Sequence, residues 1–359
     1  MKPQAGGASH QKRFGLGARA VFTGTAVGIV TLAVNVMGVG AINASNANTT
    51  RVLDPTTSTT STTSTTSTTS TTSTTSTTST TSTTQLASAP PYPVEDDTIS
   101  RADPSRDTPA RGDVPAHAGR VLPTVILRPI GVPGPLPLVV FGHGWNSNPT
   151  VYEPLLDEWA AAGYLVAAPT FPDSANTLSG SPVSNYPEQA RDISFVITAL
   201  IGGSAGPVDP TRIAVAGHSD GGTDVALLAL NPSYADPRVR AYLSLSGEIP
   251  SGVSGPWGAP TTGALLVVVG RDDEYGLLPR STQVFEAANV TAKDLLTVAG
   301  GDHLGMYIGS SFEAVAVRDE TVRFLDVALR PQGAPSAQLT SALDAMGDPS
   351  ILVTAGPSG

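Results

Sequence analysis

The feature that most constrains the fold is a series of short apolar runs, each followed by a longer amphipathic segment. Runs such as Leu136–Phe141 and Ala264–Val269 are apolar almost throughout. Strands that carry apolar side chains on both faces are typical of a parallel sheet with helices packed on each side. The sequence therefore predicts an α/β protein with a mostly parallel, doubly wound sheet and helices on both faces.

The predicted elements alternate along residues 100–332, which we interpret as one folded domain. Strands are predicted at Val121–Leu127, Leu136–Phe141, Tyr164–Pro169, Arg212–Ala216, Arg240–Ser246, Ala264–Val269 and Leu295–Val298. Helices are predicted at Tyr152–Ala162, Pro187–Ile201, Asp220–Leu230, Pro279–Ala288 and Ser311–Leu329. Ligands of such sheets bind beyond the carboxyl ends of the strands, so polar residues at those ends are the candidates for a site.

Residues 1–99 differ in composition from this domain. Residues 1–47 place Lys and Arg ahead of an apolar run and then small polar residues, as in a cleaved secretory signal peptide. An uncleaved membrane anchor is the alternative, and either form predicts a secreted or cell-surface protein. Residues 48–99 are predicted as a disordered linker, because the Thr-Thr-Ser repeat at Thr56–Thr84 has no apolar side chain to form a core. Residues 333–359 are predicted as a flexible tail.

Charge and cysteine content exclude several classes of function. The formal net charge is −10 and no cluster of Lys and Arg follows Arg19, so we expect no nucleic-acid partner. The count of Cys is 0, which excludes disulfides, thiolate zinc sites, a catalytic thiol and a lipidated cysteine. The His count is 5 and no calcium loop is recognisable, so we predict no metal and no cofactor.

A candidate nucleophile lies between a predicted strand and a predicted helix. The segment Gly217–Gly222 reads Gly-His-Ser-Asp-Gly-Gly and contains the G-x-S-x-G pattern in its strand–turn–helix setting. The flanking glycines suit a turn too tight for side chains, which would present the Ser219 hydroxyl above the sheet. An ordinary Gly-rich turn with Ser219 as a helix cap is the alternative interpretation.

A serine hydroxyl needs a base to remove its proton, and a carboxylate to orient that base. His303 is the one histidine that follows Ser219 in the chain, and it comes after the last predicted strand, as the order Ser, acid, His requires. Candidate acids are Asp273 and its neighbour Asp272 after one strand, and Glu248 after the preceding strand. Spacing alone does not choose among these three.

The tetrahedral intermediate needs backbone N–H donors. We predict the N–H of Asp220, which follows the nucleophile, and the N–H of Trp145 in the loop after an early strand. Candidate substrate-binding side chains are His143, Trp145, His218 and Trp257, although bracing of the loop is the favoured role for His143. The segments Phe171–Tyr186 and Gly247–Pro260 are the predicted cleft walls, and neither contains a positive charge, which disfavours anionic substrates.

Over about residues 100–330, these segments in combination resemble the α/β-hydrolase superfamily. The nearest resemblance is to the dienelactone-hydrolase-like and platelet-activating-factor-acetylhydrolase-like esterases, with cutinase-like polyesterases as neighbours. The matching segments are Arg120–Thr124, Gly142–Trp145, Arg191–Ile197, Arg212–Gly222, Gly270–Asp273 and Asp302–His303. The resemblance implies an α/β-hydrolase fold and an acid three residues after the strand-ending glycine, at Asp273. Asp220 departs from the Met or Leu common at its position, and Ser219 stands where some members have Cys.

The resulting prediction is an exported serine hydrolase that cleaves carboxylic esters through an acyl-serine intermediate, with Ser219, His303 and Asp273 as its triad. The substrate is expected to be a small or polymeric ester. A polyester or cutin-type hydrolase and a cell-wall acyltransferase are alternatives on the same triad. A non-enzymatic alternative is a surface-displayed binding module on an inactive hydrolase scaffold.

Overall fold

The computed structural model describes residues 91–203, 205–329 and 351–355. Contacts divide the chain into the units Met1–Thr81 and Ser82–Gly359, and every described residue belongs to the second. The predicted signal peptide at 1–47 and the repeat at 56–84 therefore lie outside the described residues. In the described part of the chain, no helix has both the length and the apolar character needed to cross a bilayer.

A single mixed sheet forms the centre of the domain, in the order β1-β2-β4-β3-β5-β6-β7-β8-β9. Its strands are β1 (Val94–Asp103), β2 (Arg120–Pro129), β3 (Leu136–Gly142), β4 (Leu165–Pro169), β5 (Val208–His218), β6 (Val239–Leu245), β7 (Ala264–Gly270), β8 (Ala292–Val298) and β9 (Ile351–Ala355). The strands from β4 to β8 in this order pair in parallel. β1 and β2 pair antiparallel at one edge and β9 at the other. The carboxyl ends of β3, β5, β7 and β8 consequently meet at one edge of the sheet.

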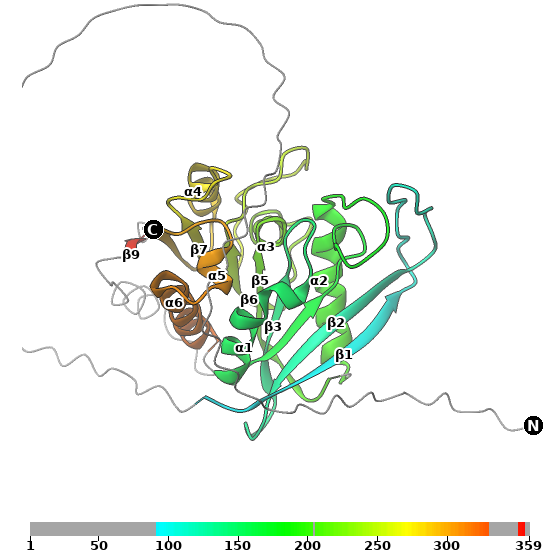
Figure 1. Cartoon of the computed structure of the whole chain (residues 1–359), viewed down its shortest axis with the longest axis horizontal. Helices are drawn as coiled ribbons and strands as arrows, with labels where there is room; N and C mark the ends of the chain where they lie inside the picture. Colours follow the sequence, from blue (N-terminus) through cyan, green and yellow to red (C-terminus); the bar gives the residue numbers. More distant parts are fainter. Residues whose placement is uncertain (1–90, 204, 330–350, 356–359) are drawn as a thin grey trace, which may run out of the picture. The chain divides into compact units, whose positions relative to one another are not determined.

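Helices cover both faces of the sheet (Figure 1). They are η1 (Pro149–Tyr152), α1 (Glu153–Ala161), α2 (Tyr186–Ile201), α3 (Asp220–Leu230), α4 (Leu278–Ala287), α5 (Gly305–Ile308) and α6 (Phe312–Ala328). The buried residues of α2, α3 and α4 share one apolar cluster with one face of the strands. Those of α1, α5 and α6 share a second cluster with the other face. Strands such as β7, in which every residue is buried, are apolar throughout because helices cover both of their faces.

The predicted mostly parallel sheet with helices on both faces is confirmed. Each predicted strand and helix is present, and β5 and β8 begin several residues earlier than predicted. The sequence missed β1, β9 and the short helix α5. β1 is largely exposed and lies at the sheet edge, where only one neighbouring strand pairs with it, so its sequence has no apolar alternation to reveal it.

Two predicted boundaries differ from the structure. The linker was predicted to extend to residue 99, whereas β1 begins at Val94 and pairs with β2 along its whole length. The tail was predicted over 333–359, and within it the structure describes β9 at Ile351–Ala355, paired with β8. Both strands are held by backbone pairing at a sheet edge.

A buried ion-pair network braces the loop that follows β4. Arg120 on β2 is completely buried and donates to Asp192 on α2 at 2.6 Å and to Asp173 in that loop at 3.0 Å. Arg111 donates to the backbone carbonyls of Pro172, Ala175 and Ser181 in the same loop. The segment 171–186 is therefore fixed to β2 and α2, which matters because it borders the site described next.

Candidate active site

Ser219 sits at the sharp turn between β5 and α3. Its backbone φ of 56° and ψ of −116° lie in a region that a side-chain-bearing residue rarely adopts. The turn packs closely, because a Cβ added at Gly221 would lie 2.0 Å from the Gly142 carbonyl oxygen. A Cβ at Gly217 would lie 2.2 Å from the Gly221 carbonyl oxygen. These glycines allow β3, β5 and α3 to approach one another and hold the Ser219 side chain at the carboxyl edge of the sheet.

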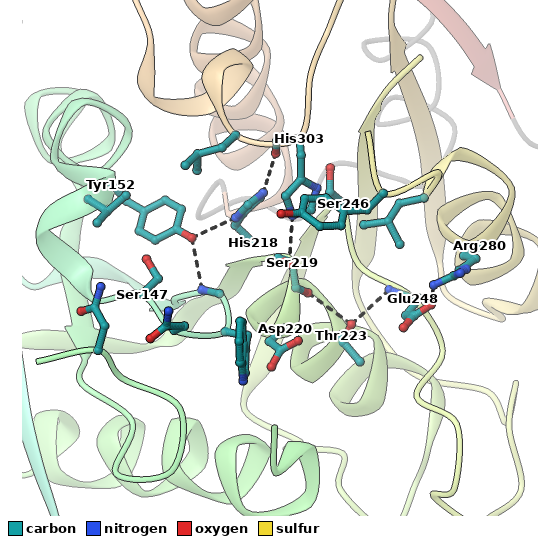
Figure 2. Close-up of a pocket in the computed structure, with 18 residues that line it drawn as sticks. Ser147, Tyr152, His218, Ser219, Asp220, Thr223, Ser246, Glu248, Arg280 and His303 are labelled. Carbon is teal, nitrogen blue, oxygen red and sulfur yellow. Dashed lines mark hydrogen bonds and ion pairs between the residues drawn. The ribbon is translucent and has the colours of Figure 1, made fainter. Parts of the chain in front are cut away.

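The structure brings Ser219, His303 and Asp273 together in one hydrogen-bonded chain, of which Figure 2 shows Ser219 and His303. His303 Nε2 lies 3.0 Å from Ser219 Oγ, and His303 Nδ1 lies 2.8 Å from Asp273 Oδ2. Because an ionised carboxylate only accepts, the Nδ1–H of His303 donates to Asp273 and leaves Nε2 free to accept the Ser219 proton. Asp273 is further held by the Tyr275 N–H, which donates to its other oxygen at 2.9 Å. This is the arrangement of a nucleophile, a base and an orienting acid.

The two competing acids lie elsewhere. Asp272 is exposed to solvent, whereas Asp273 is buried, because the chain after β7 turns between them. Glu248 points toward Arg280, which donates to it at 3.0 Å (Figure 2). The next residue, Glu274, accepts the backbone N–H of His303 at 3.0 Å and so helps to hold the loop that carries the imidazole.

Two backbone N–H groups beside Ser219 have no acceptor among the described residues. One belongs to Asp220, the first residue of α3, where intrahelical bonding leaves the N–H groups free. The other belongs to Trp145, whose neighbour Gly144 packs so near Ser219 that a Cβ at Gly144 would lie 3.2 Å from the serine Cβ. The Asp220 carboxylate turns away from Ser219 and accepts from Ser184 and Tyr186. Both predicted donors thus border the nucleophile.

A cleft of about 510 Å³ opens over this chain of residues. Its lining comprises Gly144, Trp145, Asn146, Ser147, Val151, Tyr152, Asn176, His218, Ser219, Asp220, Thr223, Ser246, Glu248, Tyr275, Leu277, Arg280, His303 and Leu304. The aromatic side chains of Trp145 and Tyr275 are 52% and 66% exposed, so the mouth of the cleft has a mixed aromatic and polar character. The two predicted wall segments contain no positive charge, but the cleft also receives Arg280 from α4, which lies outside them.

Two of the four predicted substrate-binding side chains, those of His143 and Trp257, do not line the cleft. His143 is fully buried outside the cleft lining, where its Nε2 accepts the Phe171 N–H at 3.1 Å and its Nδ1 donates to the Gly144 carbonyl at 2.8 Å. Burial lowers the pKa of His143 to about 4, so it braces the loop as a neutral side chain. Trp257 packs against the apolar core beside α3 instead of lining the cleft.

His218 borders the cleft, but both of its ring nitrogens are used inside the protein. Its Nε2 lies 2.7 Å from the His303 carbonyl oxygen and its Nδ1 lies 2.9 Å from the Tyr152 hydroxyl. The side chain is 2% exposed, so no ring nitrogen remains for a substrate. Trp145 is the predicted pocket residue whose side chain is exposed on the cleft.

Sequence reasoning missed Tyr152, Tyr275 and Arg280. Tyr152 was the first residue of a predicted helix, and nothing in its local pattern indicates that its hydroxyl reaches His218 across the site. Tyr275 stands two residues after the candidate acid Asp273. This short spacing was a signal that could have identified it as a residue of the cleft. In the described ranges, no three His, Asp or Glu side chains come together as a metal site.

An unpaired acid lies beneath the site. Asp224 on α3 is fully buried, and neither of its carboxyl oxygens has a hydrogen-bond partner among the described residues. Burial raises the pKa of Asp224 well above its ordinary value, and the nearby Asp220 and Asp192 raise it further. Folded protein therefore holds this carboxyl in its protonated form over a wider pH range than the unfolded chain does.

We expect Asp224→Asn to stabilise the protein progressively as pH rises above about 4. The raised pKa of the folded state means that the stability contributed by Asp224 is complete below its unfolded pKa and is lost as pH rises toward the folded value. The difference in free energy of unfolding between variant and wild type should grow by up to about 1.4 kcal/mol per pH unit in that window. Urea unfolding at a series of pH values measures it. A difference that stays constant with pH would contradict the raised pKa.

A sequence model of the family described as Chlorophyllase matches residues 113–247. No curated protein matches the sequence significantly. A solved structure described as a ferulic acid esterase from Streptomyces cinnamoneus is similar at a TM-score of 0.58 and 22% identity, covering 75% of this chain and 98% of that one. The fold is an α/β-hydrolase fold.

Proposed function

We propose that this chain is an exported serine hydrolase of carboxylic esters, with Ser219 as nucleophile, His303 as base and Asp273 as orienting acid. The observation that carries the proposal is the hydrogen-bonded chain from Ser219 Oγ through His303 to Asp273, with bonds of 3.0 and 2.8 Å, at the floor of an open cleft. The esterase relatives support the same class of reaction.

In the proposed mechanism, His303 Nε2 accepts the Ser219 proton while Oγ attacks the ester carbonyl carbon. The carbonyl oxygen becomes an oxyanion that accepts from the N–H groups of Asp220 and Trp145. Collapse of this intermediate breaks the bond to the alcohol, which leaves with the proton held on His303. Water then attacks the acyl-serine by the same route in reverse, which releases the carboxylic acid and regenerates the Ser219 hydroxyl.

The substrate is proposed to carry its ester next to a planar or apolar group. The Trp145 indole is 52% exposed where it lines the cleft, and its Nε1 donates to the Pro182 carbonyl at 3.3 Å, which holds the ring in place. A fixed, exposed aromatic face beside the nucleophile favours flat or apolar acyl and alcohol groups. Export is proposed from the sequence of residues 1–47, which places the enzyme outside the cell or on its surface.

Active-site labelling tests the proposal. A fluorophosphonate should react with Ser219 Oγ, which forms an O–P bond as fluoride leaves, and intact mass should show one adduct per chain. Ser219→Ala should take up no adduct. Ser246 is the matched serine, because it also lines the cleft with a positive φ of 47° but hydrogen-bonds to Tyr307 instead of a histidine. Ser246→Ala should therefore still be labelled.

Turnover of p-nitrophenyl esters from acetate to octanoate should accompany labelling. If folded wild-type protein neither forms the adduct nor hydrolyses any of these esters, the enzyme proposal is wrong and a binding module on a hydrolase scaffold becomes the better account. Adduct formation that persists in Ser219→Ala would instead show that a different residue is the nucleophile.

A further inference from the structure

A buried tyrosine and a buried histidine join two loops that come from opposite sides of Ser219. Tyr152, at the end of η1, places its hydroxyl 3.2 Å from the Gly144 backbone nitrogen and 2.9 Å from His218 Nδ1. His218, the last residue of β5, places its Nε2 2.7 Å from the backbone carbonyl oxygen of His303 (Figure 2). The chain therefore runs from the loop after β3 to the loop after β8.

The direction of each hydrogen bond in this chain follows from its ends. The His303 carbonyl can only accept, so His218 Nε2 carries the hydrogen. Burial, and then the neighbouring His303, lower the pKa of His218 to about 3, so the ring is neutral and its Nδ1 accepts. The Tyr152 hydroxyl must then donate to Nδ1, and its oxygen accepts the Gly144 N–H. A single arrangement of hydrogens satisfies every group in the chain.

Both ends of the chain border the proposed catalytic groups. The Gly144 N–H is turned toward Tyr152, and the next N–H along the backbone is that of Trp145, the proposed oxyanion donor. At the other end, His218 Nε2 donates to the backbone carbonyl of His303. The rings of His218 and His303 lie 4.6 Å apart, centroid to centroid. Tyr152 and His218 are 1% and 2% exposed, so water does not compete for these bonds.

We infer that Tyr152 and His218 are positioning residues. They hold the loop that carries Trp145, the proposed oxyanion donor, at a fixed position relative to His303, the proposed base. This inference rests on the proposed function. A displacement of either loop by less than an ångström would misalign the oxyanion donor or the base, because both must meet the same carbonyl group. The neutral state of His218 matters as well, since His303 becomes positively charged during the reaction and a second charge beside it would oppose that step.

Tyr152→Phe is the main test, because it removes the hydroxyl and keeps the ring that packs on Phe141 with centroids 4.8 Å apart. We expect kcat for a p-nitrophenyl ester to fall about five- to twentyfold, with KM changed less than about twofold. Rates are expressed per site titrated with the fluorophosphonate. A purely structural role for Tyr152 would lower only the yield of folded protein and leave kcat per titrated site unchanged.

His218→Asn is the second variant, and it keeps an acceptor near Tyr152 but cannot reach the His303 carbonyl. It should also lower kcat, and the double variant should lose less than the product of the two single losses, because both interrupt one chain. Tyr164→Phe is the matched control: it removes a buried hydroxyl that donates to Asp326 at 2.6 Å and that does not line the cleft. It should leave kcat and KM unchanged.

The outcomes separate the inference from the proposed function on which it rests. Wild-type kcat per titrated site in Tyr152→Phe, beside an inactive Ser219→Ala, would overturn the positioning role alone. Multiplicative losses in the double variant would also overturn it, because the two residues would then act independently. Full turnover by Ser219→Ala in the same assay would overturn the esterase mechanism and the inference together.

Discussion

Asp273→Asn is expected to lower kcat about 10⁴-fold, with the fold and the stability of the protein largely retained. Asparagine fits the same space, but its amide oxygen is a weaker acceptor for His303 Nδ1–H than a carboxylate. Its amide N–H can instead donate to an unprotonated Nδ1. The imidazole then adopts the tautomer that carries hydrogen on Nε2, and Ser219 loses its proton acceptor. Steady-state kinetics on a p-nitrophenyl ester, with circular dichroism to verify folding, measures the effect.

Asp272→Asn is the matched control for this variant, because it changes the adjacent residue by the same chemistry. Asp272 is exposed and its side chain lies away from the imidazole that Asp273 contacts at 2.8 Å. We expect its kcat to stay within about twofold of wild type, as is usual for exposed positions away from such contacts. The opposite result, a large loss in Asp272→Asn and none in Asp273→Asn, would mean that the acid is misassigned.

Gly221→Ala is expected to lower the free energy of unfolding by about 3 kcal/mol or more and to abolish turnover in whatever protein still folds. The added methyl group would lie 2.0 Å from the Gly142 carbonyl oxygen and 2.4 Å from the carbonyl carbon. Both atoms belong to the backbone of β3, so no side-chain rotation relieves the clash. Either α3 or β3 must shift, which would displace Asp220 at the start of α3 or Trp145 in the loop that follows β3.

Gly202→Ala is the comparison for that variant. Gly202 ends α2 with a φ of −67°, and an added Cβ would have its nearest neighbour at 3.3 Å. Its free energy of unfolding should differ from wild type by less than about 0.5 kcal/mol, and its kcat should not change. Urea unfolding and ester turnover of the two variants, measured side by side, distinguish a specific clash at Gly221 from a general sensitivity of glycine positions. Wild-type stability in Gly221→Ala would contradict the close packing of β3 against α3.

Much of the fold could be predicted because its interior strands are buried on both faces. An apolar run such as β7 has no other stable location in a soluble α/β domain, so composition alone assigns it to the centre of the sheet. The turn at Ser219 was equally predictable from the sequence. Its glycines indicate a close approach of strand and helix that larger residues would prevent. β1 was not readable, because it is a largely exposed edge strand held by backbone pairing, which leaves little trace in its side-chain pattern. β9 was missed for a different reason: its run Ile351–Ala355 is apolar and β-branched, but it lies in a Pro- and Gly-rich stretch that was interpreted as a tail.

The residues of the candidate site also fall into those that the sequence predicted and those that only the structure revealed. The identity and chain order of Ser219 and His303 were already evident from the sequence, because the chemistry of a serine nucleophile restricts the choice to very few residues. Spacing alone did not separate Asp273 from Asp272 and Glu248; the family resemblance favoured Asp273, and the coordinates place its carboxyl 2.8 Å from His303. Side-chain direction is not readable from spacing, because adjacent residues on a turn point in different directions. The same limit explains why Trp257 was expected in the cleft and why Tyr152 was overlooked.

Local pattern thus specified the layers, the order of the elements and the turn that carries the serine, since these depend on burial and on backbone space near each residue. Side-chain partnership depends instead on residues far apart in the chain, such as Tyr152 with His218, or Glu248 with Arg280 from α4. Those pairs form because the carboxyl ends of the parallel strands lie at one edge of the sheet, where the loops that follow them come together. Which hydrogen bonds are made there depends on the packing of the whole domain.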